Sequence, residues 1–268
     1  MSQTRAAFIA CLQRRLQESP LVAAAWLGGA DATGRIDALS DVDVQLVVSD
    51  DGVEAAFAMV ESLLEECGGI AHRWRVPEPI WHGHSSAVYM LKEYPSSMCL
   101  DLLVIKRSST GWLLQPERHG KIVPLVDPEG LLLQPEVDHV DHAKRRENLI
   151  SEHRDSQPIL QEVLGKTIAR GHVPEGCARY HATMISTLVD LMRCEHCPDR
   201  FDFGIRYLDR DLPEDEQALL ESLSMVGSLQ ELAQHFQRAR VEINSRLEKL
   251  CEKAMAEADS TGSLPSQT

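Results

Sequence analysis

Hydrophobic residues follow two different spacings along the chain, and the change falls near residue 135. Before it, short apolar runs bounded by turn residues predict five β-strands, over residues 21–27, 42–48, 85–91, 98–105 and 121–127. Apolar residues at every third or fourth position predict two helices in the same region. One ends at Pro20, and the other runs from Val53 to the glycines at 68–69.

Nearly all apolar residues after that point lie at helical spacing. One stripe covers residues 185–192 and a longer one covers residues 232–250, which together predict a helical bundle. We therefore expect an α+β protein with a mixed β-sheet and flanking helices first and a bundle second. The expected divisions are a sheet domain at 1–135, a helical domain at 136–256 and a disordered polar tail at 257–268.

The segments between the predicted strands indicate how some of them are arranged. Residues 92–97 are few and polar, which predicts a hairpin between the strands at 85–91 and 98–105. Pro124 has no N–H to donate to a neighbouring strand, so its strand is expected at an edge of the sheet.

The charge of the chain narrows the class of partner. The formal net charge is -14, from 27 basic and 41 acidic residues. Nucleic-acid binding depends on Lys and Arg neutralising phosphates, so a nucleic-acid partner is not expected. A cationic small molecule would be attracted instead, although the same charge also serves solubility alone.

Composition also predicts where the protein works. No apolar run reaches the about 18 to 20 residues that a membrane-spanning helix needs, so we expect no membrane partner. The seven cysteines are an odd number, and the first residues form an amphipathic helix pattern and not a secretion signal. We therefore expect a cytoplasmic protein whose cysteines form no disulfide framework.

Three aspartates carry the candidate chemistry. Asp41 and Asp43 lie on one face at the start of the predicted strand 42–48, because strand side chains alternate. Asp101 lies inside the strand at 98–105 and joins them if the two strands are neighbours. Three such carboxylates repel one another, and a divalent cation removes that penalty. Hard oxygen ligands at an open site favour Mg²⁺.

Two glycines upstream fit the same chemistry. Gly28 and Gly29 follow a predicted strand directly, where backbone N–H groups without a neighbouring Cβ can approach phosphate oxygens. Ser40 could add a hydroxyl donor. A phosphate cradle beside acidic metal ligands favours phosphoryl or nucleotidyl transfer, with Asp101 as the candidate general base. The simpler alternatives are a solvated strand end and an ordinary turn.

The residues GGADATGRIDALSDVDVQLVV at 28–48, with CLDLLVI at 99–105, resemble a known family. They are similar to the nucleotidyltransferase superfamily typified by DNA polymerase β, whose motif is Gly with Gly or Ser, a loop, Asp-x-Asp and a third carboxylate on a later strand. The aminoglycoside and lincosamide nucleotidyltransferases, which have a helical C-terminal domain, are the most similar group.

The resemblance implies a role for each matching residue. Gly28 and Gly29 would line the triphosphate, and Gly29 stands where many relatives have Ser, which removes one hydroxyl but leaves the backbone donors. Asp41 and Asp43 would bind Mg²⁺, and Asp101 would complete the metal site or act as base.

Two weaker similarities follow later in the chain. PLVDPEG at 124–130 resembles the strand and turn after the third carboxylate. FGIRYLDRDLP at 203–213 resembles a basic segment of the helical domain, in which a Lys or Arg reaches the nucleotide phosphates. Arg206 is the matching residue, and an ordinary surface or ion-pair arginine is the alternative.

The implied activity is Mg²⁺-dependent transfer of a nucleoside monophosphate, AMP from ATP, to a hydroxyl of a small molecule with release of pyrophosphate. An aminoglycoside acceptor fits the acidic charge, and antibiotic-resistance enzymes have this architecture. One alternative is an antitoxin-like enzyme that modifies a protein or tRNA, although those relatives are usually single short domains. The other is a non-catalytic nucleotide-binding regulatory module, although degenerate members tend to lose the carboxylates.

Other residues with metal-binding potential have simpler explanations. Cys177, His181, Cys194 and Cys197 are four possible zinc ligands, but Cys194 continues an apolar stripe, so buried unreactive cysteines are the preferred interpretation. His82 and His84 share a face if their segment is extended. The segment is then either a loop that faces the substrate or a surface loop with ordinary histidines. The acidic run at 209–221 could bind a cationic substrate, but Pro213 within it predicts the start of a helix.

Overall fold

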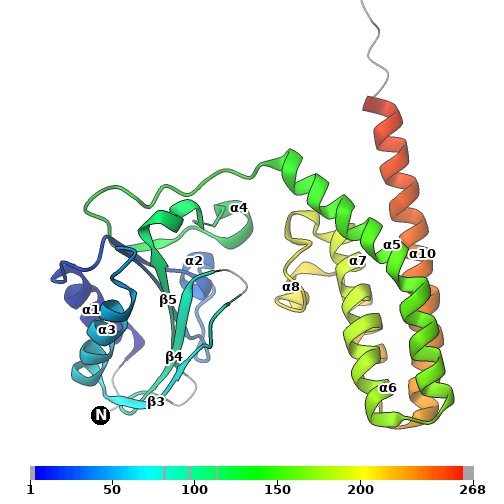
Figure 1. Cartoon of the computed structure of the whole chain (residues 1–268), viewed down its shortest axis with the longest axis horizontal. Helices are drawn as coiled ribbons and strands as arrows, with labels where there is room; N and C mark the ends of the chain where they lie inside the picture. The colour runs from blue at the N-terminus through cyan, green and yellow to red at the C-terminus, as the bar shows by residue number, and fades with distance from the viewer. Residues whose placement is uncertain (1–3, 81–82, 96–97, 113, 262–268) are drawn as a thin grey trace, which may run out of the picture. The chain divides into compact units, whose positions relative to one another are not determined.

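The computed structural model describes residues 4–80, 83–95, 98–112 and 114–261, which form two compact units that divide between Val137 and Asp138. The first is a mixed sheet with helices and the second is a set of helices (Figure 1), so the predicted α+β class is confirmed. None of the helices in these ranges combines the length and apolar character that crossing a bilayer requires.

The sheet of the first unit has six strands in the order β3-β4-β5-β2-β1-β6. Their bounds are β1 Ala24–Leu27, β2 Val42–Val48, β3 Ile70–Arg75, β4 Ser85–Leu91, β5 Cys99–Lys106 and β6 Val123–Val126. The β4–β5 pair is antiparallel, as the hairpin prediction requires, whereas β5 runs parallel to β2. Strand β6, which contains Pro124, is at an edge as predicted.

The main helices of this unit cover one face of the sheet. The unit contains α1 Arg5–Gln17, α2 Gly29–Thr33, α3 Val53–Cys67, α4 Pro116–His119 and the 3-10 turn η1 Arg107–Trp112. Helices α1 and α3 lie on the same face (Figure 1), and Phe8 and Phe57 are buried in the core beneath them. A smaller cluster around Trp26 covers part of the opposite face and leaves the ends of β2 and β5 near Asp43 outside it.

Strand β3 has no counterpart among the predicted strands. It pairs with β4 at an edge of the sheet, and its residues are exposed or partly exposed. A strand shows alternating apolar and polar residues when one of its faces is buried. Both faces of β3 are largely exposed, so its sequence IAHRWR lacks that alternation.

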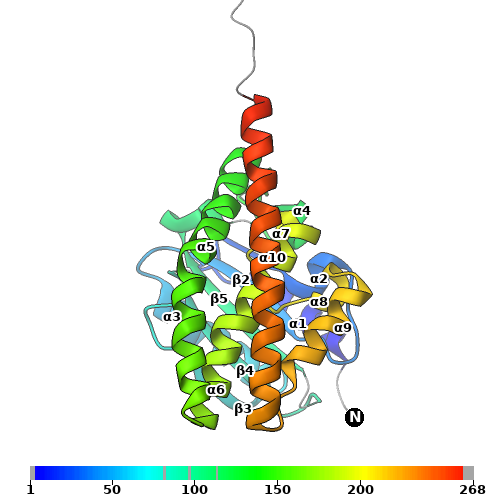
Figure 2. The same ribbon diagram turned by 90° about the vertical axis from the view of Figure 1, so that its right-hand side faces the viewer.

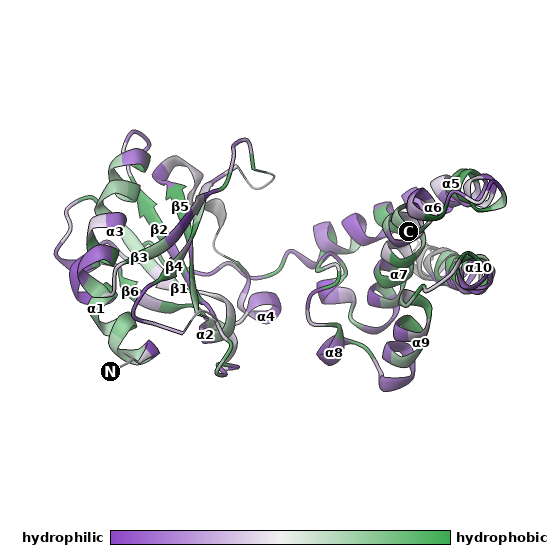
Figure 3. Ribbon diagram, turned by 90° about the horizontal axis from the view of Figure 1, so that it is seen from below, coloured by the Kyte–Doolittle hydropathy of each residue, from purple (hydrophilic) through white to green (hydrophobic). Residues whose placement is uncertain are grey.

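The second unit contains the helices and turns α5 His139–Ala169, α6 Val173–Tyr180, η2 His181–Ile185, α7 Ser186–His196, η3 Pro198–Arg200, α8 Leu208–Asp211, α9 Glu214–Ser224 and α10 Leu229–Thr261. The long helices α5 and α10 lie side by side (Figure 2). Both helices carry hydrophobic and hydrophilic residues, whereas strands β2 and β5 of the first unit are mainly hydrophobic (Figure 3). Both predicted apolar stripes are buried, with Leu188 and Ile243 completely so.

Part of the predicted tail is helical. Helix α10 continues through residues 257–261, for which the sequence predicts disorder. The remaining residues, 262–268, lie outside the described part of the chain.

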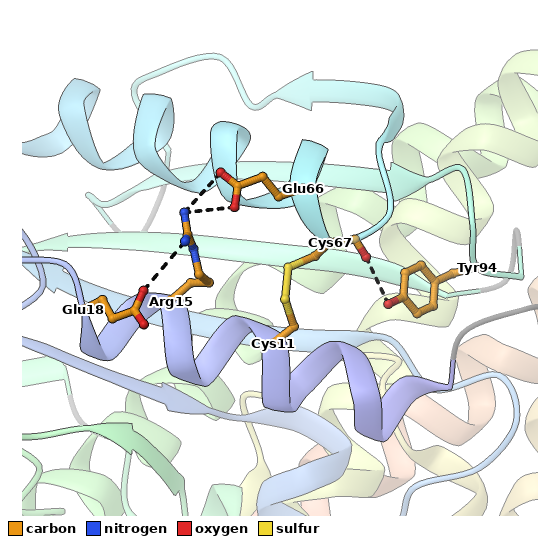
Figure 4. The surroundings of a disulfide bond; sticks show 6 residues. All are labelled: Cys11, Arg15, Glu18, Glu66, Cys67 and Tyr94. Atoms are coloured by element: carbon orange, nitrogen blue, oxygen red, sulfur yellow. Dashed lines mark hydrogen bonds and ion pairs between the residues drawn. A yellow bond between two sulfur atoms is a disulfide. The ribbon is translucent and has the colours of Figure 1, made fainter.

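One disulfide is present, although the sequence predicts reduced cysteines and no disulfide framework. Cys11 in α1 and Cys67 at the end of α3 are bonded, with their Cα atoms 6.6 Å apart (Figure 4). Nearby, Arg15 binds Glu66 and the Tyr94 hydroxyl donates to the Cys67 carbonyl at 3.2 Å. The pairing depends on two helices packing side by side on the sheet, which the spacing of the cysteines does not reveal.

Removing this disulfide is expected to lower the free energy of unfolding by about 2–4 kcal/mol, because the bond closes a loop across 56 residues of chain. Urea unfolding of the Cys11→Ser, Cys67→Ser double variant measures the loss. Reduction of the wild-type protein should give the same decrease, and the double variant should not respond to reductant. A double variant as stable as the oxidised wild type would contradict the prediction.

Candidate functional site

The strand register brings two of the predicted aspartates face to face. Asp43 in β2 and Asp101 in β5 are direct partners in the parallel pair, which confirms that their strands are neighbours. Val42 and Val44 point into the core, so Asp43 projects from the opposite face. Asp41 precedes β2 by one residue, and one of its carboxylate oxygens accepts the Cys99 N–H at the start of β5. The three aspartates therefore come from the beginnings of two neighbouring parallel strands.

The glycine turn lies directly against Asp43. The Gly28 N–H donates to the Asp43 carbonyl at 3.0 Å, which continues the β1–β2 pairing beyond the strand. Gly29 has φ +51, and a Cβ built on it would lie 1.9 Å from Oδ2 of Asp43. A side chain at this point would displace the Asp43 carboxylate and strain the backbone, whereas glycine does neither.

Gly29→Ala is expected to displace the Asp43 carboxylate and to weaken binding of Mn²⁺, a probe for Mg²⁺, by at least about tenfold. Gly34→Ala is the matched control, because Gly34 also has a positive φ of +67 but has no atom within 4 Å of the point where an added methyl group would lie. Both variants share the backbone strain of about 1 kcal/mol, so the clash alone separates them. Equal Mn²⁺ affinities, measured by electron paramagnetic resonance, would contradict the prediction.

The electrostatics of the site centre on Asp43. Burial, together with the negative charges of Asp101, Asp41 and Asp31, raises the pKa of its carboxyl to about 6 against the opposing effect of Arg5. Ionising a carboxyl group among like charges costs free energy, and a bound cation removes that cost.

Asp43→Asn is expected to stabilise the metal-free protein at neutral pH. Because the folded-state pKa of Asp43 lies above the ordinary value of 3.8, folding is penalised once this group ionises. The free energy of unfolding of the wild type therefore falls as the pH rises from about 4 to about 6. Melting temperatures in EDTA should favour the variant at pH 7.5 and converge near pH 4. A variant that melts lower than the wild type at pH 7.5 would contradict this.

The sequence interpretation missed two residues of this site. Arg5, in the first turn of α1, donates from Nη1 and Nη2 to both carboxylate oxygens of Asp31 in α2, at 3.0 and 2.5 Å. The same Nη2 atom donates to the Asp41 carbonyl at 2.8 Å. Both side chains are largely buried, with 18% and 6% of their area exposed. No local pattern links Arg5 to Asp31, because only the tertiary fold brings the first residue of α1 to α2.

The donor set fits a hard divalent cation, although the three carboxylates are not drawn tightly together. Asp41, Asp43 and Asp101 do not form a trio of oxygens within 4.8 Å of one another. One oxygen of Asp41 accepts the Cys99 N–H at 2.9 Å, which fixes that side chain at the start of β5. These three carboxylates are the residues that would hold Mg²⁺, because Asp31 is already bound by Arg5.

Ser40 has a local role in the loop before β2. Its hydroxyl donates to Asp37 Oδ1 at 2.8 Å and accepts the Asp37 N–H at 2.8 Å. The hydrogen bonds from Ser40 and from the Leu39 N–H lower the pKa of the Asp37 carboxyl. A phosphate contact by Ser40, as predicted, would require its hydroxyl to leave Asp37.

Arg206 lies in the second unit, on a loop organised by a buried arginine. Arg193 is completely buried, pairs with the equally buried Asp211 side chain at 2.9 Å and donates to the carbonyls of Gly204 and Arg206. The Arg206 side chain is exposed and lies over the Phe203 ring. The contacts of Arg193 therefore fix the backbone of the loop, and the Arg206 side chain lies at the surface. The contact between Arg206 and a phosphate stays a prediction.

The same loop contains a strained residue. Tyr207 has φ 62, a value that is rare for a bulky side chain, and the Arg210 guanidinium stacks on its ring at 3.8 Å. The buried arginine and this stack together fix the loop conformation.

The cysteines and histidines of the second unit do not form the zinc group considered above. Among the described residues, only Glu195, His196 and Glu216 bring three potential ligand atoms within 4.8 Å of one another. Arg246 already binds that acidic pair, with contacts to Glu216 at 2.6 and 2.8 Å. Burial raises the pKa of the Cys194 thiol to about 12, which agrees with a buried unreactive cysteine.

Of the two predicted histidines before β4, His82 lies outside the described residues. His84 is 5% exposed, so it is not an ordinary surface histidine. The neighbouring Ser85 hydroxyl donates to Glu78 at 2.6 Å and lowers the pKa of that carboxyl.

Comparisons with known proteins identify no family. No family model matches the chain, and no curated protein matches it. Among solved structures, one similar chain is an aminoglycoside 6-adenyltransferase from Bacillus subtilis, at 14% identity and a TM-score of 0.33, covering 94% of this chain and 90% of that one. A likeness this distant assigns no activity, so the function must be argued from the site itself.

Proposed function

We propose that the protein is a Mg²⁺-dependent nucleotidyltransferase that transfers AMP from ATP to a hydroxyl of a small molecule. The observation that carries the proposal is the pairing of Asp43 with Asp101 across two parallel strands, beneath a turn where Gly29 leaves no room for a side chain. Carboxylates that repel one another beside a backbone turn suit a site for a metal and phosphates.

Each residue has a part in this chemistry. Asp41, Asp43 and Asp101 would hold Mg²⁺, which when bound supplies charge stabilisation to the attacking and leaving oxygens. The turn at Gly28 and Gly29 would face the triphosphate, with Ser40 as a hydroxyl donor once it is released from Asp37.

The reaction balances without a further reactant. The acceptor hydroxyl oxygen forms a bond to the α-phosphorus, the bond from that phosphorus to the bridging oxygen of the β-phosphate breaks, and pyrophosphate leaves. Asp101, which is exposed at the end of β5, would take the hydroxyl proton as general base.

The acceptor we propose is a cationic small molecule such as an aminoglycoside. The formal charge of -14 attracts cations to the protein and disfavours nucleic acid.

We also propose a cytoplasmic location. Thiols are kept reduced in that compartment, so alkylation of lysates followed by mass spectrometry should find free thiols at Cys11 and Cys67. A bond already formed in the cell would count against that location.

A pyrophosphate-release assay tests the activity. The purified protein is incubated with Mg²⁺ and each of the four nucleoside triphosphates, together with aminoglycosides and other amino sugars as acceptors. Acceptor-dependent release of pyrophosphate and an acceptor mass increased by AMP are expected with ATP. Absence of release across the panel would reject the activity, and a nucleotide adduct on a co-purified protein or tRNA would favour the antitoxin-like alternative.

A further inference from the structure

A fourth carboxylate lies beside the three predicted ligands. Asp31 is two residues after Gly29, and the Arg5 Nη2 atom that binds its carboxylate also binds the Asp41 carbonyl. The Asp31 side chain is 6% exposed, so water screens its charge poorly. An uncompensated carboxylate at this position would repel a triphosphate held at the neighbouring glycines.

Arg5 is built to cancel that charge. Its guanidinium binds both oxygens of Asp31 in a two-point contact, the geometry in which an arginine pairs most strongly with a carboxylate. It also donates to the Asp41 carbonyl, which fixes the chain where β2 begins.

We propose that Arg5 is a positioning residue of the nucleotide site: by neutralising Asp31 and holding the chain at Asp41, it makes the Gly28–Gly29 turn able to accept a triphosphate. The inference rests on the proposed function. It assigns to helix α1 an indirect part in nucleotide binding, and it explains why an acidic residue is tolerated so close to the glycines that would bind phosphate.

The charges predict opposite effects on two ligands. Without Arg5, the Asp31 charge is uncompensated, so affinity for ATP should fall whereas affinity for Mn²⁺ alone should hold or rise. A residue that only supported the fold would weaken both ligands together. The ratio of the two affinities therefore separates a charge role from a merely structural one.

The test uses the full-length protein and titrates ATP with Mg²⁺ and, separately, Mn²⁺ alone. Arg5→Gln should weaken ATP binding by about tenfold, which corresponds to one charge interaction of about 1.4 kcal/mol. Arg5→Lys should keep most of the affinity, and adding Asp31→Asn to Arg5→Gln should restore it to within about threefold of the wild type. Arg15→Gln is the matched control, because Arg15 is on the same helix but pairs with Glu66.

The outcomes distinguish this inference from the proposed function. If the wild type binds no ATP, or binds it equally well after Asp43→Asn, the proposed nucleotide site itself is wrong. If that site holds, unchanged ATP affinity in Arg5→Gln or a double variant as weak as Arg5→Gln overturns the role of Arg5. Asp31→Asn alone keeps the test valid if Arg5→Gln does not fold. It should bind ATP at least as tightly as the wild type, and weaker binding would overturn the inference.

Discussion

Asp43→Asn is expected to lower the rate of pyrophosphate release by about a thousandfold or more, which corresponds to about 4 kcal/mol of lost transition-state stabilisation. Asp43 lies between its direct partner Asp101 and the Gly29 turn, at the centre of the site. Asparagine keeps the size of the side chain and removes the negative charge that a metal requires. The rate is measured with ATP, Mg²⁺ and the acceptor found in the panel.

Asp50→Asn is the matched control for this change. Asp50 follows the opposite end of the same strand, where it accepts the Ser108 N–H at 3.0 Å, so its loss should leave the rate within about twofold. Binding of Mn²⁺ should disappear in Asp43→Asn and persist in Asp50→Asn. If Asp43→Asn released pyrophosphate at the wild-type rate, a binding module or a different catalytic centre would have to be considered.

Arg193→Met is expected to lower the free energy of unfolding of the helical unit by about 3–5 kcal/mol, the usual cost of leaving a buried charge without its partner. The variant removes the ion pair between Arg193 and the completely buried Asp211 side chain. Asp211 keeps its ion pair with Arg200. It also leaves the Gly204 carbonyl without the Arg193 donor. Urea unfolding measures the loss, and hydrogen exchange of peptides from residues 186–212 locates it.

Arg145→Met removes a comparable pair at the surface. Arg145 binds Asp202 at 3.1 Å and 52% of its side chain is exposed, so solvent screens the interaction and the expected loss is below about 1 kcal/mol. A similar loss in both arginine variants would show that burial of the Arg193 pair has no energetic consequence.

The two glycines and three aspartates could be predicted because their positions follow from local rules. Alternation in a strand places Asp43 on the face opposite the buried Val42 and Val44, and turn residues mark where the strands end. The hairpin of β4 and β5 and the edge position of β6 were predictable for the same reason. Strand β3 was not, because its exposed edge position imposes no buried pattern.

The buried pair in the helical unit shows how local rules fail. Asp211 belongs to an acidic run that predicts the start of a helix, and α9 does begin after Pro213. The structure nevertheless buries Asp211 against Arg193, from another helix of the same unit. From composition alone such residues are expected to be solvated charges. Only the folded chain determines which of them are buried away from water.

By itself the sequence determined the two classes of secondary structure, the face of β2 from which Asp43 projects and the acidic charge, because each depends on residue type and short-range periodicity. Tertiary structure decided that β5 lies parallel to β2 with Asp101 opposite Asp43, that Arg5 binds Asp31, and that Cys11 reaches Cys67. These contacts join residues far apart in the chain. They form only when the helices pack on the sheet, and no local pattern records which distant residues will meet.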